Sequence, residues 1–297
     1  MNYEFQISDF KSHIPNLKLG IGQAATLACL LEATAPKVGN VHRGADFAEL
    51  FFADFVTSAV AIGPALERAR ETGVGQAILD AITATRALVD TNTNLGMVLL
   101  LAPLAAVPLD QKLKGGIESV LQGLTPHDSE LVYQAIRLAQ PGGMGKRDEM
   151  DIAGAAPPSL LAAMEHAAER DLIAKQYVEN FALVLQEILP NLVAGQERGW
   201  TLIDTIIREH VRLISAHPDS LIVRKCGLET AQQASTYAAQ VLRAGEPDDE
   251  NYHAALNDFD FWLRSDDHRR NPGTTADLIA AGLFAGLREG LLKPPYR

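Results

Sequence analysis

Apolar side chains recur at helical spacing through almost the whole chain. A spacing of i, i+3, i+4, i+7 and i+11 puts the side chains on one face of an α-helix. The clearest run with this spacing is Ala24, Leu27, Ala28, Leu31 and Ala35. A weaker run of the same kind lies between Leu228 and Leu242. Alternating patterns with hairpin turns, which would indicate β-strands, are nearly absent.

Further helices are expected over residues 46–72, 75–89, 93–105, 126–139, 158–174, 176–189, 197–216, 248–264 and 274–292. Short segments marked by glycine and proline separate them. The pattern predicts an all-α protein, a multi-helix bundle of about ten to twelve helices joined by short loops.

The chain has 297 residues, of which 47% are hydrophobic, so it can bury one large core or two fused ones. No sequence period repeats. We expect a single all-α catalytic domain over residues 1–297, and the alternative is two helical lobes that meet near residues 140–159. That segment, QPGGMGKRDEMDIAGAAPPS, is the longest stretch of turn-forming residues, and it is either a plain linker or a functional loop.

The charge balance excludes some partners. The chain carries 26 basic and 37 acidic residues, a formal charge of -11, which repels nucleic acid and anionic membranes. The longest apolar run, residues 95–109, is too short and too rich in proline to cross a bilayer. The first ten residues lack the features of a signal peptide, so a cytoplasmic location is expected.

Cysteine is rare in the sequence. Cys29 and Cys226 both lie in apolar, alanine-rich helical patterns, and no zinc-type spacing exists. We therefore expect two buried free thiols and no disulfide.

A polar run stands directly before the most apolar stretch of the chain. Thr91, Asn92, Thr93 and Asn94 precede LGMVLLLAPLAAV, which is expected to form a buried helix. Two interpretations of the polar run are open. It is either a cap that starts the helix or a cluster that the helix holds in place to bind a substrate.

The first segment with chemical potential is LLEATAPKVGNVHRGADF, residues 30–47. Glu32 lies on the apolar side of its helix, so its carboxylate requires a partner. That partner is either a nearby Lys or Arg, or else Glu32 is a metal ligand or general base. The other polar residues of the segment are Lys37, Asn40, His42, Arg43 and Asp46. The cations among them, beside flexible glycines, are candidates for binding phosphate.

The second segment is HPDSLIVRKCG, residues 217–227. Asp219 follows a proline and is suited to be the N-cap of a helix. Asp219 beside Arg224 and Lys225 also suits a site for Mg²⁺ and phosphate, in which the cations neutralise the remaining charge. Both interpretations remain open on the sequence.

The third segment is RRNPGTTADLIAAG, residues 269–282. Thr274 and Asp277 have the spacing of a capping box, which gives Asp277 a structural interpretation. The same helix start, at Pro272 and Gly273, directs free N–H groups at an anion. Capping leaves Asn271 unexplained. Polar loops at helix ends in several separated parts of the chain are expected when a helical bundle directs them at one anionic ligand.

Taken in order, these segments resemble one known family. The run ACLLEATAPKVGN with the following HRGADF, then TNTNLG, PGGMG, DSLIVRKCG and NPGTTADL are similar to the triphosphoribosyl-dephospho-CoA synthases over about residues 24 to 290. The resemblance implies an all-α enzyme that takes ATP and 3'-dephospho-CoA. Such an enzyme releases adenine and joins C1 of the ATP ribose to the 2'-hydroxyl of the acceptor.

The resemblance also implies roles for residues. Mg²⁺ would screen the triphosphate, and Glu32 and Asp219 are its candidate ligands. The candidate catalytic carboxylates are Glu32, Asp46 and Asp219, which would transfer protons or stabilise an oxocarbenium-like ribose. The candidate substrate and phosphate contacts are Lys37, Asn40, His42, Arg43, Thr91, Asn92, Asn94, Arg224, Lys225, Asn271, Gly273 and Asp277.

The sequence departs from the family pattern at the polar run, where Asn92 stands in place of an imidazole. Asparagine orients a substrate but transfers no proton at neutral pH. Three alternatives follow: the same ATP chemistry on a different acceptor of another cofactor pathway, a non-catalytic helical binding protein, and a helical hydrolase of ADP-ribose-type bonds. Partners other than ATP and the small-molecule acceptor are not expected, apart from a second copy of the chain in a homodimer.

Overall fold

The computed structural model describes residues 19–140 and 154–296. Within these ranges it is helical, and its extended backbone pairs at only two isolated bridges, between residues 42 and 45 and between residues 47 and 50. The prediction of an all-α protein is confirmed. Most of the predicted loop over residues 140–159, including PGGMG, lies outside the described residues.

The first half of the chain contributes seven of the described helices. They are α2 (Ile21–Thr34), α3 (Phe52–Glu67), α4 (Ala69–Thr72), α5 (Val74–Arg86), α6 (Leu95–Ala106), α7 (Leu113–Gln122) and α8 (Pro126–Ala139). The second half contributes α9 (Leu160–Ala167), α10 (Leu172–Val178), a π-helical turn η1 (Val184–Ile188), α11 (Leu189–Glu197), α12 (Leu202–Ala216), α13 (Ser220–Cys226), α14 (Leu228–Ala244), α15 (Glu250–Arg264) and α16 (Gly273–Arg288).

The described part of the chain thus has 15 α-helices, more than the ten to twelve expected. Two predicted spans are interrupted. The helix expected over residues 46–72 begins only at Phe52 and breaks after Glu67, and the one over 158–174 breaks at Asp171, which caps α10. Helix α7 was not expected, because its sequence LKGGIESVLQ contains two glycines.

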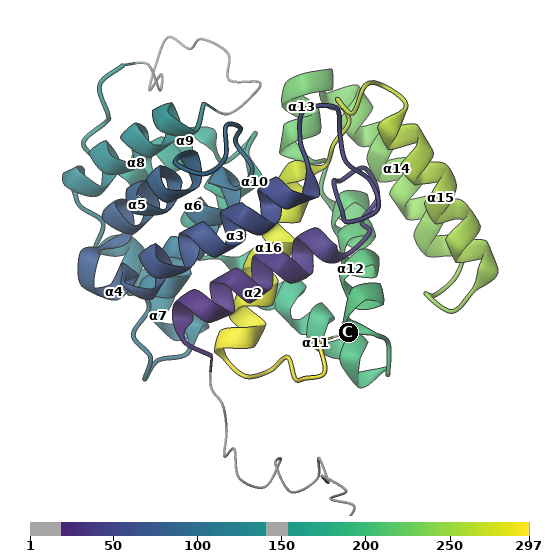
Figure 1. Cartoon of the computed structure of the whole chain (residues 1–297), viewed down its shortest axis with the longest axis horizontal. Coiled ribbons are helices and arrows are strands. Elements are labelled where there is room, and N and C mark those ends of the chain that lie inside the picture. Colours follow the sequence, from purple (N-terminus) through teal and green to yellow (C-terminus); the bar gives the residue numbers. More distant parts are fainter. Residues whose placement is uncertain (1–18, 141–153, 297) are drawn as a thin grey trace, which may run out of the picture.

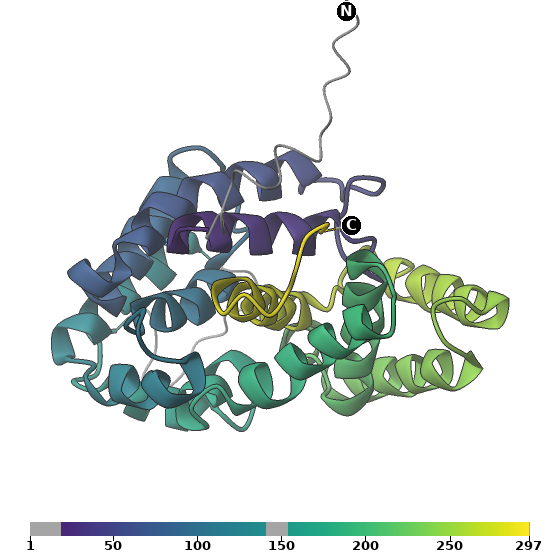
Figure 2. The ribbon, with the colours of Figure 1, turned by 90° about the horizontal axis from the view of Figure 1, so that it is seen from below.

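Helix α16 forms the centre of the molecule. Thirteen of its sixteen residues are buried, and it packs against α2, α6, α11 and α12. In Figure 1 it runs behind α2 and α3, and Figure 2 shows it between α2 and the helices that follow α9. Small side chains permit this close packing. A Cβ at Gly282 would lie 2.4 Å from Cγ2 of Ile188.

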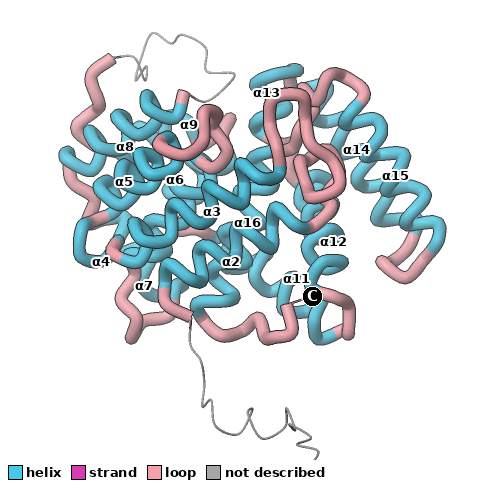
Figure 3. The backbone as a smooth tube through the Cα atoms, viewed as in Figure 1, coloured by secondary structure: helices cyan, strands magenta, loops and turns pink. Residues whose placement is uncertain are grey.

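The buried apolar side chains form two clusters. The larger one is formed by residues of the helices from α2 to α12 together with residues of α16. The smaller one lies among α12, α14 and α15 and includes Val38 from the loop after α2. Helices α14 and α15 lie side by side at one end of the molecule (Figure 1), and the long loop between α2 and α3, pink in Figure 3, reaches toward that end.

Helix α6 is the predicted buried helix of the polar-to-apolar stretch. Ten of its twelve residues are buried, so this prediction is confirmed. No helix in the described ranges has the length and hydropathy needed to span a bilayer.

The two cysteines are free, as expected. Cys29 is buried in α2, whereas Cys226, at the end of α13, is only partly buried. The prediction that both thiols are buried therefore holds for Cys29 alone, because the chain turns at Gly227 and leaves Cys226 near the surface.

Candidate active site

Ends of four helices meet in the interior, at the C-terminal half of α2 and the N-termini of α6, α13 and α16. Three contacts show the convergence. Asp219 at the start of α13 binds Thr275 of α16, Gly96 in the first turn of α6 abuts the carboxylate of Asp277, and Cys29 of α2 lines a pocket with Asn94. The structure thus brings together segments that lie far apart in the sequence.

Glu32 forms a buried ion pair with Lys37. The Lys37 Nζ to Glu32 Oε1 distance is 2.8 Å, and both side chains are almost completely buried. The ammonium also donates to the backbone carbonyl of Glu32 and, at 3.3 Å, to that of Ala35. Burial raises the pKa of Glu32, and the charge of Lys37 opposes this rise. In this arrangement all the donors of Lys37 point at the protein, so the ammonium is not available to a phosphate.

Asp219 fastens two helices together. Its Oδ1 accepts from the backbone N–H groups of Leu221 at 2.8 Å and Ile222 at 3.1 Å, which makes it the N-cap of α13. Its Oδ2 accepts from the N–H of Thr275 at 2.7 Å and from the hydroxyl of the same residue at 2.8 Å. Burial raises the pKa of Asp219, and these hydrogen bonds oppose the rise. The N-cap interpretation of Asp219 is confirmed.

The capping box expected between Thr274 and Asp277 is absent. Helix α16 begins at Gly273, its N-cap is Pro272, and no side chain caps it locally. The cap comes instead from Asp219, fifty-six residues earlier, which binds the N–H of Thr275. Because a carboxylate of the protein occupies this helix end, Asp277 is left without the structural role that the spacing suggested.

Asp277 has no hydrogen bond or ion pair among the residues that the structure describes. Its carboxylate lies against Gly96, where a Cβ would be 2.0 Å from Oδ2. Burial, followed by the negative charges of Glu32 and Asp219, raises the pKa of Asp277 well above its usual range. The glycine at position 96 therefore makes room for a carboxylate.

The polar run before α6 is mostly bound within the protein. Oδ1 of Asn92 accepts from the N–H of Leu95 at 3.1 Å, and the hydroxyls of Thr93 and Ser58 hydrogen-bond each other. Nδ2 of Asn94 donates to Oγ1 of Thr85 at 3.0 Å, but Oδ1 of Asn94 is buried without a partner. Both interpretations of the run thus have support. Asn92 binds the first N–H of the helix, and Asn94, the N-cap residue, keeps one acceptor unused.

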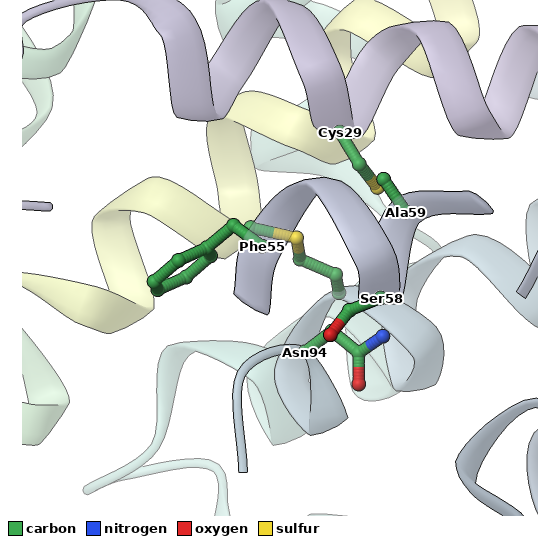
Figure 4. A pocket seen from close by; sticks show the side chains of 6 residues that line it. Cys29, Phe55, Ser58, Ala59 and Asn94 are labelled. Carbon is green, nitrogen blue, oxygen red and sulfur yellow. The ribbon is translucent and has the colours of Figure 1, made fainter. Parts of the chain in front are cut away.

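A small pocket opens beside Asn94 (Figure 4). It is lined by Cys29, Phe55, Ser58, Ala59, Asn94 and Met97. Burial raises the pKa of the Cys29 thiol far above its usual value, and the charges of Glu32 and Asp277 add to the shift. The thiol is therefore neutral.

Asn40 and Asn271 bind each other. Nδ2 of Asn40 donates to Oδ1 of Asn271 at 2.7 Å, and the guanidinium of Arg264 donates to the carbonyl of Asn40 at 2.7 Å. Gly273 follows directly, and a Cβ there would lie 2.7 Å from Cδ2 of Leu221. These contacts hold the loop after α2 against the start of α16.

The other predicted residues of that loop lie nearer the surface. Arg43 and Asp46 are exposed, and Oδ1 of Asp46 accepts from the N–H of Phe52 at 2.7 Å. His42 is half-buried, and its burial lowers its pKa. Thr91, in the polar run, is also only partly buried. The structure does not bring Asp46 into contact with Glu32 or Asp219.

The predicted cations of α13 lie at the edge of the cluster. Arg224 forms an ion pair of 2.9 Å with Asp171, the N-cap of α10. Burial lowers the pKa of Lys225, which is half-buried. The charge of Arg224 opposes the rise in the pKa of Asp277, and the charge of Asp171 adds to it.

Two residues of this region were missed. Asp171 stands directly before an apolar helical run and thus has an N-cap signature in the sequence. His210 of α12 is fully buried, and neither ring nitrogen has a hydrogen-bond partner. Burial, followed by the charge of Lys37, lowers the pKa of His210 well below its usual value. No spacing rule links His210 to a lysine 173 positions earlier.

The expected magnesium ligands do not fit as a pair. All the acceptor positions of Asp219 are taken by N–H and O–H donors, and Oε1 of Glu32 is paired with Lys37. Among the described residues, no group of three or more His, Cys, Asp and Glu side chains is arranged to hold a metal ion.

Comparison with known proteins gives a matching family and similar solved structures. The family described as ATP:dephospho-CoA triphosphoribosyl transferase matches residues 18–295. The chain is similar to a solved structure described as a candidate triphosphoribosyl-dephospho-CoA synthase from Archaeoglobus fulgidus. The TM-score is 0.60, the identity is 25%, and the match covers 79% of this chain and 99% of the other. No protein with a curated description matches the sequence.

Proposed function

The chain belongs to the ATP:dephospho-CoA triphosphoribosyl transferase family, and from this premise we propose that it displaces adenine from ATP and transfers the triphosphoribosyl unit to the 2'-hydroxyl of 3'-dephospho-CoA. The observation that carries the proposal is the carboxyl group of Asp277, which is partly buried, lies against Gly96 and has no hydrogen-bond or ion-pair partner among the described residues.

Asp277 is the general acid in this proposal. Its raised pKa keeps it protonated at a pH where an ordinary aspartate is ionised. Adenine is a poor leaving group as an anion, so it requires a proton when the bond from C1 of the ribose to its ring nitrogen breaks. A protonated, partly buried carboxyl group supplies that proton, as the general acid does in glycoside hydrolysis.

Glu32 is the second carboxylate. Lys37 favours its ionised form, and Oε2 of Glu32 has no partner among the described residues. An ionised carboxylate near the ribose accepts the proton of the attacking hydroxyl and stabilises positive charge on C1. Asp219 contributes in another way, because its hydrogen bonds fix the start of α16 and hence the position of Asp277.

The triphosphate requires cations. Arg43 and Lys225 are predicted phosphate contacts whose side-chain cations have no hydrogen-bond or ion-pair partner among the described residues. Arg224 forms one ion pair, with the partly exposed Asp171. Mg²⁺ binds through one or two carboxylates together with phosphates and water. We propose that it enters as MgATP, the substrate, since Glu32 and Asp219 do not form a ready ligand pair.

The experiment is an incubation of the protein with MgATP and dephospho-CoA, with free adenine measured by chromatography and the product by mass spectrometry. Release of adenine together with an acceptor heavier by a triphosphoribosyl unit supports the proposal. The variant Asp277→Asn should lower turnover by about 10²- to 10⁴-fold. Asp110→Asn, which changes an exposed carboxylate, is the matched control and should leave turnover unchanged.

Two other results have clear meanings. Adenine release that requires a different hydroxyl acceptor would support the same ATP chemistry in another cofactor pathway. That alternative arises because Asn92 stands where the family pattern has an imidazole. An absence of adenine release together with an absence of ATP binding by calorimetry would overturn the transferase proposal.

A further inference from the structure

A pocket of about 330 Å³ lies beside α10. Leu172, Lys175 and Glu179, which share one face of α10 and its end, line it on one side. Gln186 and Glu187 of η1 line it on another side. Pockets of about 300 to 1,000 Å³ hold small organic ligands, so this one is large enough for a part of a substrate.

The segment that joins α10 to η1 has an unusual backbone. Asn180 and Phe181 have φ angles of 50° and 59°, in the left-handed region that is unfavourable for an aromatic residue. Ala182 and Leu183, which line the pocket, follow directly. The turn η1 is π-helical, a rare form that is frequent at functional sites. An unfavourable backbone beside a pocket favours a role in binding a ligand.

The charged side chains of the pocket are neutralised within the protein. Lys175 pairs with Glu179 at 3.6 Å, and Glu187 pairs with Arg212 at 3.4 Å. Burial lowers the pKa of His217, the other titratable residue of the lining, so its imidazole is neutral at neutral pH. A phosphate requires an unpaired cation, and a metal ion requires an unpaired carboxylate. The pocket therefore suits a ligand without charge.

The rest of the lining combines apolar and polar groups. Leu172, Ala182 and Leu183 present aliphatic surface, whereas the amide of Gln186 and the imidazole of His217 can donate and accept hydrogen bonds. Such a lining suits a neutral chain in which alkyl and amide groups alternate. Dephospho-CoA has one part of this kind, its pantetheine arm, which carries amide groups, a hydroxyl group and methyl groups.

The first turn of α10 connects the pocket with the candidate active site. The N–H of Leu172 donates to Oγ of Ser220, at the start of α13, at 2.9 Å. The next residue, Ile173, has its Cδ1 2.8 Å from the position of a Cβ at Gly96, which is also in contact with Oδ2 of Asp277. The arm of dephospho-CoA is joined to its reacting ribose through a diphosphate. An arm beside α10 is thus compatible with a ribose beside Asp277.

We propose that this pocket binds the pantetheine arm of the acceptor while the ribose of the acceptor lies beside Asp277. The inference rests on the proposed function and names the part of the chain that recognises the second substrate. The arm takes no part in the bonds that form and break. Contacts with it therefore lower KM for the acceptor without a change in kcat.

The test fills the pocket with a larger side chain. Ala182→Trp should raise KM for dephospho-CoA by about tenfold or more, with kcat and KM for ATP unchanged. Ala254→Trp makes the same change at an exposed position of α15 and should leave all three values unchanged. Gln186→Ala, at an exposed position, removes an amide without added bulk and should raise KM for dephospho-CoA by about 2- to 10-fold.

Calorimetry separates the arm from the nucleotide part of the acceptor. Ala182→Trp should weaken the binding of dephospho-CoA by the same factor as KM, and the binding of ADP, which lacks the arm, should not change. An unchanged dissociation constant for dephospho-CoA in Ala182→Trp, or an equal loss of ADP binding, would overturn the inference.

Two further outcomes are decided by the same measurements. If Ala182→Trp loses the helical circular dichroism of the unchanged protein, Gln186→Ala takes its place, and unchanged binding of dephospho-CoA in that variant overturns the inference. If the unchanged protein releases no adenine, the proposed function fails, and the dissociation constants for dephospho-CoA and ADP still decide whether the pocket binds the arm.

Discussion

Three carboxylates lie in one buried region and differ in what neutralises them. Glu32 has a lysine, Asp219 has four hydrogen-bond donors, and Asp277 has neither. The sequence predicts that Glu32 requires a partner, because it lies on the apolar side of its helix. It does not predict that Asp277 is the unpaired one. Its capping box with Thr274 is a local pattern, and the actual cap of α16 comes from a distant part of the chain.

The free energy of unfolding should depend on pH through Asp277. The folded protein holds the proton of Asp277 more tightly than the unfolded chain does, because the folded pKa is raised. The stabilisation is therefore complete below the unfolded pKa and is lost as pH rises through the folded pKa. Asparagine at this position does not titrate. The melting temperature of the Asp277→Asn variant should therefore increase relative to that of the unchanged protein as pH rises.

Thermal melts at about pH 5 and pH 8 check this prediction, with a relative gain of about 2 °C or more expected at the higher pH. The control is Asp110→Asn, whose carboxylate is exposed. A difference between Asp277→Asn and the unchanged protein that is constant across this range would contradict the raised pKa.

The buried ion pair gives a second prediction. Lys37→Met leaves the carboxylate of Glu32 buried without its cation and should lower the free energy of unfolding by about 3 to 5 kcal/mol. The double variant Glu32→Gln with Lys37→Met removes both charges and should recover most of that loss. Urea denaturation measures both. A loss below about 1 kcal/mol in Lys37→Met would mean that solvent reaches the pair.

At the scale of the elements, the sequence predicts where helices form better than it predicts where they are interrupted. The limits of α8 agree with the predicted span 126–139, because Thr125 and Pro126 mark its start. The break before α10 could not be seen, since apolar residues on both sides of Asp171 continue the helical period. Asp219 marks the start of α13, but the seven residues of this helix are too few to show a helical period in the sequence.

The contact between α6 and α16 can be tested with one methyl group. Gly96→Ala places a Cβ 2.0 Å from Oδ2 of Asp277, so the helix or the carboxylate must move. Displacement of a catalytic group by about 1 Å costs about 10²-fold in rate, so kcat for adenine release should fall by about that factor. Steady-state kinetics measures the effect.

The matched control is Gly115→Ala in α7, where a Cβ meets nothing within 4 Å. It should leave kcat unchanged and raise helix stability by up to about 1 kcal/mol. Equal kcat values in the two variants would show that Asp277 takes no part in the reaction.

At the scale of the molecule, the two apolar clusters are joined. Helix α12 packs against both α14 and α16, and Leu256 contacts both clusters. We therefore expect a single cooperative unfolding transition. The sequence predicts enough apolar surface for such a core, but it does not reveal that α16 is the element at the centre.

Two probes check this cooperativity. Trp262 packs against the smaller cluster, so in a Trp200→Phe variant its fluorescence reports on that cluster, whereas far-UV circular dichroism reports on all the helices. The two melting curves should coincide. A fluorescence midpoint several degrees below that of circular dichroism would show that the smaller cluster unfolds first.

The central position of α16 also bears on synthesis. Proteins are made from the N-terminus, and α16 follows in the chain all the helices that it packs against. Until it leaves the ribosome, the surfaces that it covers on α2, α6, α11 and α12 have no permanent neighbour. The nascent chain thus holds a groove of exposed apolar surface for most of its synthesis, a form that favours chaperone binding and aggregation. A ribosome that stalls just before residue 273 would leave the largest apolar core without its central helix.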